Sequence, residues 1–358
     1  MLYETETRRP SGRRLRRNEA RLQVTTALLG ILATAALLVL AVVAFMIVQV
    51  YPYFRKLDPA RLPAWHPFKS EQAKALYLER YEESSQQWPV EFEQRMVGTS
   101  YGSTFVRVFG PEGAPPLVLL PGGGSSSLTW APMARALAAH FRTYAIDNLG
   151  DIGRSVASRA IRTADDVADS LDELLTALGL TDSIRLMGLS YGGWQSAEYA
   201  IRHGDRLHKV VLVAPAATLF ELPPDFAWRG LLLLMPHRHF TESMMRWSLP
   251  DLAARSDPAS RRQFDTLVGD AYLGVRCFDL RMAAKPRVFT DAELARLEDK
   301  TLFMVGAHER LYPANDAIAR FKTAAPNIRT EMIPDAGHDL LWIQTAVVAD
   351  KLVGFLRD

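Results

Sequence analysis

Ser190 lies at the centre of a Gly-x-Ser-x-Gly pentad, between Gly188 and Gly192, and this pentad limits the possible folds more than any other feature. An apolar run at 183–187 precedes it and predicts a buried strand, and 194–203 is compatible with a helix. A pentad between strand and helix places its serine on a strained turn, where small neighbours let the two elements pack closely. The sequence therefore predicts an α/β fold with Ser190 as a nucleophile; the alternative is an ordinary turn serine.

Two further strand candidates, 301–306 and 329–333, are each followed by a residue suited to assist a serine. Glu309 follows the first strand and His338 follows the second, in the chain order Ser, acid, His of hydrolases with this pentad. The carboxyl ends of parallel strands share one edge of a sheet, so we expect both side chains to lie near Ser190. His338 would serve as the general base, and Glu309 would orient its ring and stabilise the imidazolium.

The acid is the least constrained member of this set, because exposed glutamates are common. Asp335 and Asp339 are the competing carboxylates, although both are very close to His338 in sequence. His338 itself has an alternative interpretation as a surface histidine after a turn.

The oxyanion formed during acyl transfer needs two preorganised backbone N–H donors. One is expected to be the amide of Tyr191, which follows the nucleophile, and the other an amide from the loop after an earlier strand. That strand is 117–120, and residues 121–127, Pro-Gly-Gly-Gly-Ser-Ser-Ser, form what we call the glycine loop. Gly123 is the predicted second donor. A phosphate-binding loop is disfavoured, because no Gly-Lys-Ser/Thr follows the glycines.

Together these motifs resemble the α/β-hydrolase superfamily, specifically its single-domain carboxylesterase-like members, over residues 88–358. The motifs that carry the resemblance are Thr99-Ser-Tyr-Gly102, Pro115-Pro-Leu-Val-Leu-Leu-Pro-Gly-Gly-Gly124, Tyr144-Ala-Ile-Asp147, Gly150-Asp-Ile-Gly-Arg-Ser155, Gly188-Leu-Ser-Tyr-Gly-Gly193, Gly306-Ala-His-Glu-Arg-Leu-Tyr-Pro313 and Ala336-Gly-His338. The resemblance implies a mostly parallel eight-stranded sheet with helices on both faces and a helical lid after the sixth strand. It implies no metal and no organic cofactor.

The chain departs from the family pattern at two positions. The glycine loop usually begins with His-Gly, and here Pro121 replaces the histidine, which removes a side chain that usually braces the loop. The acid is more often aspartate, and here it is Glu309. The serine nucleophile indicates acyl transfer to water, because the related dehalogenases and epoxide hydrolases carry an aspartate at this point.

Residues 218–299 interrupt the alternation of strands and helices, and we expect them to form the lid. Most of their apolar side chains would pack the lid on the core, and a minority would line an apolar acyl pocket. The apolar residues concerned are Phe220, Leu222, Phe226, Trp228, Leu231 to Met235, Met244, Met245 and Trp247. A hydrophobic ester is the small-molecule substrate that such a pocket favours.

Residues 22–50 contain no charged side chain and are long enough to cross the hydrocarbon core of a bilayer, about 30 Å thick. Arginines precede this segment and aromatic residues follow it, which predicts an uncleaved signal anchor with a cytoplasmic N-terminus and an extracytoplasmic hydrolase domain. A cleaved signal peptide is the alternative, but its apolar region is normally shorter. The flanking residues are Arg8, Arg9, Arg13, Arg14, Arg16, Arg17 and Arg21 on one side and Tyr51, Tyr53 and Phe54 on the other.

The basic tail, residues 1–21, carries seven arginines against three glutamates, so the net charge of +2 leaves a slightly acidic remainder. This distribution indicates contact with lipid head groups and no nucleic-acid surface. The single cysteine, Cys277, excludes a disulfide framework. Residues 51–90 are expected to be a juxtamembrane linker with a helix at 70–87, capped by Ser70, and residues 91–358 the hydrolase domain.

The predicted function is a serine hydrolase that cleaves a carboxylic ester, or a related acyl substrate, through an acyl-enzyme. One alternative is an aminopeptidase similar to proline iminopeptidases, for which Glu221, Asp225 and Glu242 are the available acidic residues. The other is a catalytically silent hydrolase-fold binding protein of the envelope, which Pro121 and the anchor motivate.

Overall fold

The structure is a computed structural model that describes residues 12–56, 68–278, 284–297 and 299–358. The chain divides into two compact units, Met1–Arg61 and Leu62–Asp358. Two arginines of the basic tail, Arg8 and Arg9, lie outside the described residues. The same holds for three prolines of the linker, Pro59, Pro63 and Pro67.

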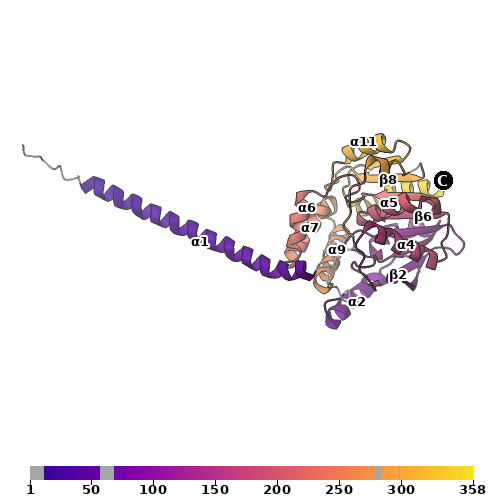
Figure 1. Ribbon diagram of the computed structural model, residues 1–358, viewed down its shortest axis with the longest axis horizontal. Helices are drawn as coiled ribbons and strands as arrows, with labels where there is room; N and C mark the ends of the chain where they lie inside the picture. Colours follow the sequence, from indigo (N-terminus) through magenta and orange to yellow (C-terminus); the bar gives the residue numbers. More distant parts are fainter. Residues whose placement is uncertain (1–11, 57–67, 279–283, 298) are drawn as a thin grey trace, which may run out of the picture. The chain divides into compact units, whose positions relative to one another are not determined.

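The first unit contains one continuous helix, α1 (Gly12–Lys56), seen in Figure 1. Its segment Gln23–Phe45 has a mean hydropathy of 2.8, and none of it is buried in the structure. At about 1.5 Å per residue, these 23 residues extend over about 35 Å, which is enough to cross a membrane. By length and composition α1 is therefore a candidate membrane span, and a signal sequence would have the same character.

The second unit is built on one sheet with the strand order β1-β2-β4-β3-β6-β7-β8-β9. Strands from β4 onward along this order pair in parallel, while β2 pairs antiparallel with β1 and β4. A two-residue strand, β5, adds to β2, so the sheet has nine strands where the sequence predicts eight. The strands are β1 (Glu93–Thr99), β2 (Gly102–Phe109), β3 (Pro116–Leu120), β4 (Arg142–Ile146), β5 (Val156–Ala157), β6 (Ile184–Leu189), β7 (Leu207–Val213), β8 (Thr301–Gly306) and β9 (Arg329–Ile333).

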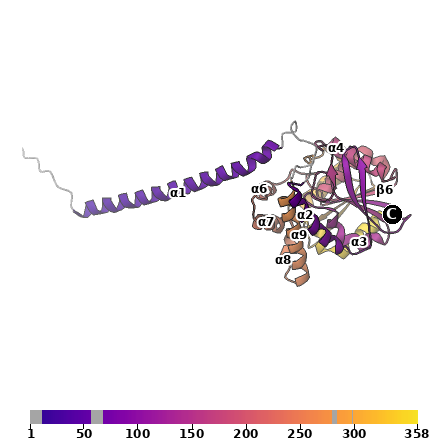
Figure 2. The same cartoon turned by 90° about the horizontal axis from the view of Figure 1, so that it is seen from below.

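The central parallel strands are buried on both faces, as their continuous apolar sequences predict. Alternate side chains of β3 belong to two different hydrophobic clusters, with Val118 in one and Leu119 in the other. Helices α4 (Ala164–Ala177), α5 (Tyr191–His203) and α11 (Ala314–Ala324) cover the first face. Helices α3 (Ala131–Ala138), α12 (Leu340–Ile343) and α13 (Thr345–Arg357) cover the second, and Figure 2 shows α4 and α3 on opposite sides of the sheet.

Helix α2 (Glu71–Gln86) belongs to this second unit, so the compact body begins before the boundary at residue 91 that the sequence predicts. The predicted cap is confirmed, because Ser70 Oγ accepts a hydrogen bond from Ala73 N at 3.1 Å. The helix packs on the body through Tyr77 and Tyr81, which are both buried, whereas Leu76 is 50% exposed.

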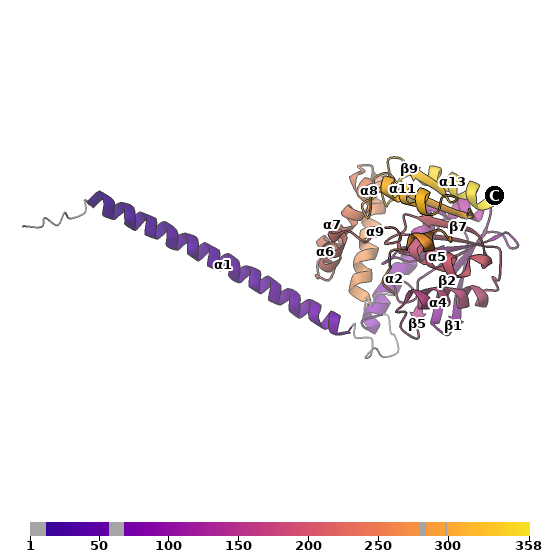
Figure 3. The ribbon, with the colours of Figure 1, turned by 45° about the horizontal axis from the view of Figure 1, so that its top comes forward.

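The segment after β7 forms the expected helical lid, whose described residues exclude 279–283 and 298. Figure 3 shows helices α6 to α9 gathered at one end of the sheet. Met244 and Trp247 are buried, whereas Trp228 and Leu231 are 45% and 38% exposed. The lid helices are α6 (Pro224–Leu232), α7 (Arg238–Ser248), α8 (Pro250–Ala254), α9 (Pro258–Cys277) and α10 (Asp291–Leu294).

Candidate active site

Ser190 occupies the turn between β6 and α5, with φ 55° and ψ −114°. A positive φ is a strained conformation for a residue with a side chain, and such strain concentrates at functional sites. The backbone holds the turn from both sides: Ser190 N donates to Val213 O at 2.9 Å, and Ala216 N donates to Ser190 O at 3.0 Å. This is the geometry expected of an exposed nucleophile at the carboxyl edge of the sheet.

The two glycines of the pentad are required by close backbone contacts. A Cβ on Gly188 would lie 2.0 Å from Gly192 O, and a Cβ on Gly192 would lie 2.3 Å from Leu120 O. The glycines therefore allow α5 to approach both its own strand and the end of β3. This approach brings the turn of Ser190 against the glycine loop.

Glu309 and His338 are brought together from the loops after β8 and β9. His338 Nδ1 lies 2.7 Å from Glu309 Oε2, and the Glu309 side chain is fully buried. The other carboxylate oxygen, Oε1, accepts hydrogen bonds from Arg310 N at 2.8 Å and Leu311 N at 2.9 Å. The carboxylate is thus held in place by the backbone while it binds the imidazole, which orients the ring through Nδ1 and leaves Nε2 for chemistry.

The two groups stabilise each other's charged form. Burial by itself would raise the pKa of Glu309, but the charge and hydrogen bond of His338 and the two backbone N–H groups bring that pKa below its usual value. Burial by itself would lower the pKa of His338, but Glu309, with a contribution from Asp339, brings that pKa above its usual value. A raised pKa makes His338 a stronger base for accepting a proton from a serine.

The competing carboxylates have other positions. Asp335 is exposed, and Asp339 accepts hydrogen bonds from Leu252 N at 2.8 Å and Gly337 N at 3.1 Å. Among the described residues, no hydrogen bond joins the Ser190 hydroxyl to His338. Such bonds are often long before substrate binds.

The glycine loop lies directly on the turn of the nucleophile. The Cβ position of Gly122 is 3.5 Å from Ser190 Cβ, and that of Gly123 is 3.4 Å from Tyr191 Cβ. Gly124 N donates to the carboxylate of Asp151 at 2.9 Å, so this amide is engaged within the protein. The predicted donor Gly123 is therefore adjacent both to the turn and to a fixed peptide.

Asn148 and Asp151, for which no sequence motif predicts a role, contact the glycine loop from the segment after β4. Asn148 Nδ2 donates to Pro121 O at 3.4 Å, and Asp151 binds Gly124 N. One available signal was their position after a strand, at the same edge of the sheet as the candidate triad. The motif Gly150 to Ser155 contains Asp151, but it points only to the family and to no role for this carboxylate.

The acidic residues available to an aminopeptidase are either exposed or bound to a neighbouring side chain of the lid. Asp225 Oδ1 accepts a hydrogen bond from Trp228 Nε1 at 2.9 Å. Glu242 forms an ion pair with Arg246 on the same helix at 2.7 Å, and Glu221 is exposed. Their local pairing offers little recognition for a free α-amino group.

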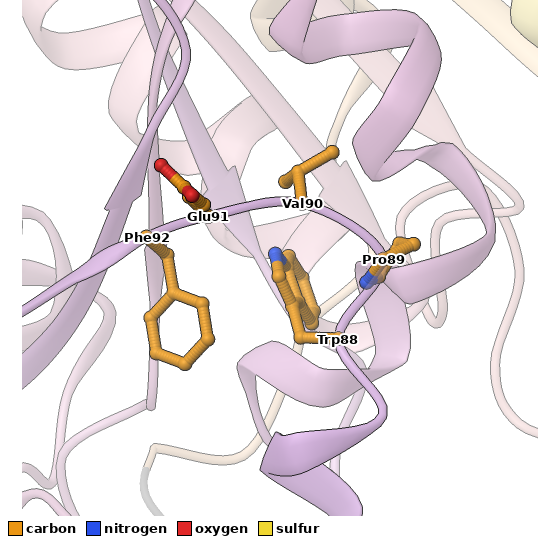
Figure 4. Close-up of a pocket in the computed structure, with 5 residues that line it drawn as sticks. All are labelled: Trp88, Pro89, Val90, Glu91 and Phe92. Atoms are coloured by element: carbon orange, nitrogen blue, oxygen red, sulfur yellow. The ribbon is translucent and has the colours of Figure 1, made fainter.

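A depression in the described surface lies apart from this site. It has a volume of about 560 Å³, and Trp88, Pro89, Val90, Glu91 and Phe92 line it (Figure 4). All five belong to one continuous segment, and only Glu91 carries a titratable side chain. Within the described residues, no group of three or more His, Cys, Asp or Glu side chains could hold a metal ion.

Comparisons with known proteins identify the family of the chain. The model of the alpha/beta hydrolase fold family matches residues 115–345. Carboxylesterase YbfK of Bacillus subtilis is 32% identical over 286 residues, which are 78% of this chain and 93% of that protein.

Two solved structures from the same organism are also similar. The crystal structure of carboxylesterase CesB (YbfK) has a TM-score of 0.71 and 31% identity, covering 80% of this chain and 98% of that one. The structure of naproxen esterase has a TM-score of 0.71 and 30% identity, covering 79% and 98%.

Proposed function

This chain belongs to the alpha/beta hydrolase family and is a carboxylic ester hydrolase, and from that premise we propose that Ser190, Glu309 and His338 are its catalytic triad. The observation that carries the proposal is the 2.7 Å contact between His338 Nδ1 and Glu309 Oε2, at the sheet edge where Ser190 occupies its strained turn. Each member follows a different strand at one edge of the sheet, which supports a joint role in acyl transfer.

In the proposed acylation step, Ser190 Oγ attacks the ester carbonyl carbon while His338 Nε2 accepts the hydroxyl proton. Glu309 stabilises the resulting imidazolium through Nδ1–H. The N–H groups of Gly123 and Tyr191 bind the oxyanion of the tetrahedral intermediate. Collapse of the intermediate breaks the ester C–O bond, and His338 donates its proton to the departing alcohol.

In the second step, water replaces the alcohol. The oxygen of this water attacks the acyl carbon while His338 accepts one of the water protons. The second tetrahedral intermediate then releases the carboxylic acid, and His338 returns the proton to Ser190 Oγ. We propose a hydrophobic acyl group, because half-buried apolar lid residues such as Phe220 and Phe226 pack on the core beside the sheet.

The test combines a fluorophosphonate probe with hydrolysis of p-nitrophenyl esters of graded chain length. Wild-type protein is expected to be labelled and active, and Ser190→Ala to lose both properties by several orders of magnitude. Ser158→Ala, an exposed serine, is the matched control and should behave as wild type. Labelling that persists in Ser190→Ala would refute the assignment of the nucleophile. A folded wild-type protein without labelling would indicate a silent binding protein.

We also propose that residues 22–50 anchor the enzyme in a bilayer, with the tail 1–21 in the cytoplasm and the hydrolase domain with its lid outside it. The apolar, unburied helix Gln23–Phe45 and the arginines before it support this layout. Two fusions to a reporter that is active only after export test this orientation. In one, the reporter follows residue 56, and in the other it precedes residue 12. Activity of the upstream fusion would reverse the orientation, and release of the protein by alkaline carbonate would refute the anchor.

A further inference from the structure

We propose that Asp151 is a positioning residue that fixes the glycine loop for oxyanion binding. The inference rests on the proposed function, because it has a catalytic consequence only if the loop supplies an oxyanion donor. Asp151 lies outside the triad, and its action would pass through the backbone of the loop.

The contacts of Asp151 join two loops that are far apart in sequence. Its Oδ2 accepts a hydrogen bond from Gly124 N at 2.9 Å, and its Oδ1 lies 3.2 Å from the same nitrogen. Oδ1 also accepts a bond from Ile152 N at 2.7 Å. A single carboxylate thus connects the loop after β3 to the segment after β4.

The bond to Gly124 acts one peptide away from the proposed donor. The Gly124 N–H belongs to the peptide plane that follows Gly123, so fixing it restricts rotation about the Gly123 backbone. Gly124 itself has φ +71°, which glycine adopts without strain. The direction of the Gly123 N–H therefore depends on a contact that Asp151 supplies.

The loop needs such a contact because its own sequence provides little restraint. Three consecutive glycines have the largest backbone freedom of any tripeptide, and Pro121 stands where the family usually has a bracing histidine. Other hydrogen bonds of the loop run from Asn148 Nδ2 to Pro121 O at 3.4 Å, from Ser125 Oγ to Gly122 O at 2.7 Å and, at its far end, from Ser127 N to Asp147 Oδ1 at 2.7 Å. Asp151 is the carboxylate that binds an amide of the glycine run itself, and a carboxylate forms a stronger, charge-assisted bond.

Asp151 is itself held by packed neighbours. Ile152 is buried, and a Cβ on Gly274 of α9 would lie 2.2 Å from Ile152 Cδ1, so the segment after β4 packs tightly on a lid helix. Burial raises the pKa of Asp151 to about 6, which the two backbone N–H bonds oppose and the charge of Asp147 reinforces. At neutral pH the carboxylate is therefore mostly ionised and is a strong acceptor.

The experiment measures ester hydrolysis and inhibition for the full chain in detergent micelles, with Asp151→Asn and Asp151→Ala. A trifluoromethyl ketone is the probe of the oxyanion site, because Ser190 would add to it and form a bound oxyanion. Removing one oxyanion donor typically costs about 10²–10³ in kcat, so a misaligned donor should cost about 10–100-fold. We expect KM to change less than about threefold, and the inhibition constant to rise by the same factor as kcat/KM falls. Asn should be milder, because it keeps one acceptor oxygen.

Asp166→Asn is the matched control. Its carboxylate likewise accepts backbone N–H bonds, from Arg162 at 2.9 Å and Thr163 at 3.0 Å, at the start of α4. This variant should retain wild-type kinetics even if it loses some stability.

The outcomes separate this inference from the function on which it rests. Folded Asp151 variants with wild-type kcat, with higher kcat, or with a loss confined to KM would overturn the positioning role. Turnover that persists in Ser190→Ala would overturn the proposed function instead. If Asp151→Ala does not fold, Asp151→Asn carries the same comparison of kcat with the inhibition constant.

Discussion

Glu309 and His338 form a pair whose protonation should control the enzyme. His338 must be neutral to accept a proton, and its pKa lies above the usual 6.5 because of Glu309. Glu309 has the opposite shift, below the usual 4.5. The pair therefore stabilises the fold most at pH values between the Glu309 pKa and the His338 pKa. Its contribution is lost as pH falls through the Glu309 pKa or rises through the His338 pKa.

We predict that Glu309→Gln lowers both the rate and the midpoint of the pH profile. Wild-type kcat/KM should rise with pH to a midpoint above 6.5. Without the carboxylate charge, the His338 pKa should fall and the midpoint should move to lower pH. The rate at the optimum should drop by about 10³–10⁴-fold, as when a triad acid is neutralised. The measurement is kcat/KM from pH 5 to 9.

Asp335→Asn is the control, because Asp335 is exposed. If Asp335→Asn shifts the midpoint and Glu309→Gln does not, the acid has been assigned to the wrong residue.

At the residue scale, the candidate triad could be predicted because each member is part of a short motif next to an apolar strand. Ser190 has its glycines, and Glu309 and His338 each follow a strand that the structure contains. The role of Asp151 could not be predicted in the same way. Its partner Gly124 is a backbone amide on another loop, and no side-chain type signals where a backbone amide will lie.

At the element scale, the lid helix α8 is attached close to the candidate triad. Asp339, next to His338 in sequence, binds Leu252 N, and His308, next to Glu309, pairs with Asp251 at 3.0 Å. These contacts differ in burial. Asp339 is fully buried, whereas the His308 side chain is 51% exposed.

We predict that Asp339→Ala destabilises the protein far more than His308→Ala. The first variant leaves the buried N–H groups of Leu252 and Gly337 without their partner, at a cost of about 1–3 kcal/mol for each unpaired group. The second removes an exposed pair that contributes about 0–1 kcal/mol. Urea denaturation measures both changes, and limited proteolysis reports whether the lid opens. Equal losses in the two variants would contradict this account.

Helix α2 illustrates what sequence patterns leave open at this scale. Its position and its Ser70 cap were predictable, but it packs through Tyr77, Tyr81 and Ser85, spaced four residues apart. Tyr81 OH lies within 3.1 Å of both Ser127 Oγ and Asp147 Oδ2, both buried in the body. A helix with apolar residues on several sides does not reveal which side meets the body, because the covering surface comes from distant strands.

At the scale of the whole molecule, the body extends to the residues just before α2. Lys69 N donates to Cys277 O at 2.9 Å, and Phe68 pairs with Phe278 in an isolated bridge. The buried Arg107 is stacked on Trp88 and Phe92 at 4.7 and 4.0 Å from the ring centres. The segment 68–92 is therefore part of the folded core and cannot serve only as a spacer.

We predict that removing residues 1–67 leaves a folded hydrolase, whereas removing residues 1–90 prevents folding. The longer deletion removes Ser85 and Trp88, which contact the guanidinium of Arg107, and leaves a buried charge without its hydrogen-bond partner. Gel filtration and thermal unfolding of both proteins test this. A monomeric, cooperatively melting protein from the longer deletion would show that α2 is dispensable.

The fold as a whole was predictable because parallel strands, buried on both faces, have long apolar sequences between recognisable turns. The short β5 was not predictable. It has two residues, Val156 and Ala157, and it exists only because Gly102 of β2 leaves room for its backbone.

The separate origins of Ser190 and His338, in the loops after β6 and β9, have a consequence for biosynthesis. Translation proceeds at about 5–20 residues per second, so α1 leaves the ribosome on the order of tens of seconds before His338 does. In the later part of this interval, after Ser190 has been made, the nascent chain contains the proposed nucleophile but not yet the proposed base. On the proposed triad, hydrolysis is then among the last properties that the growing chain acquires.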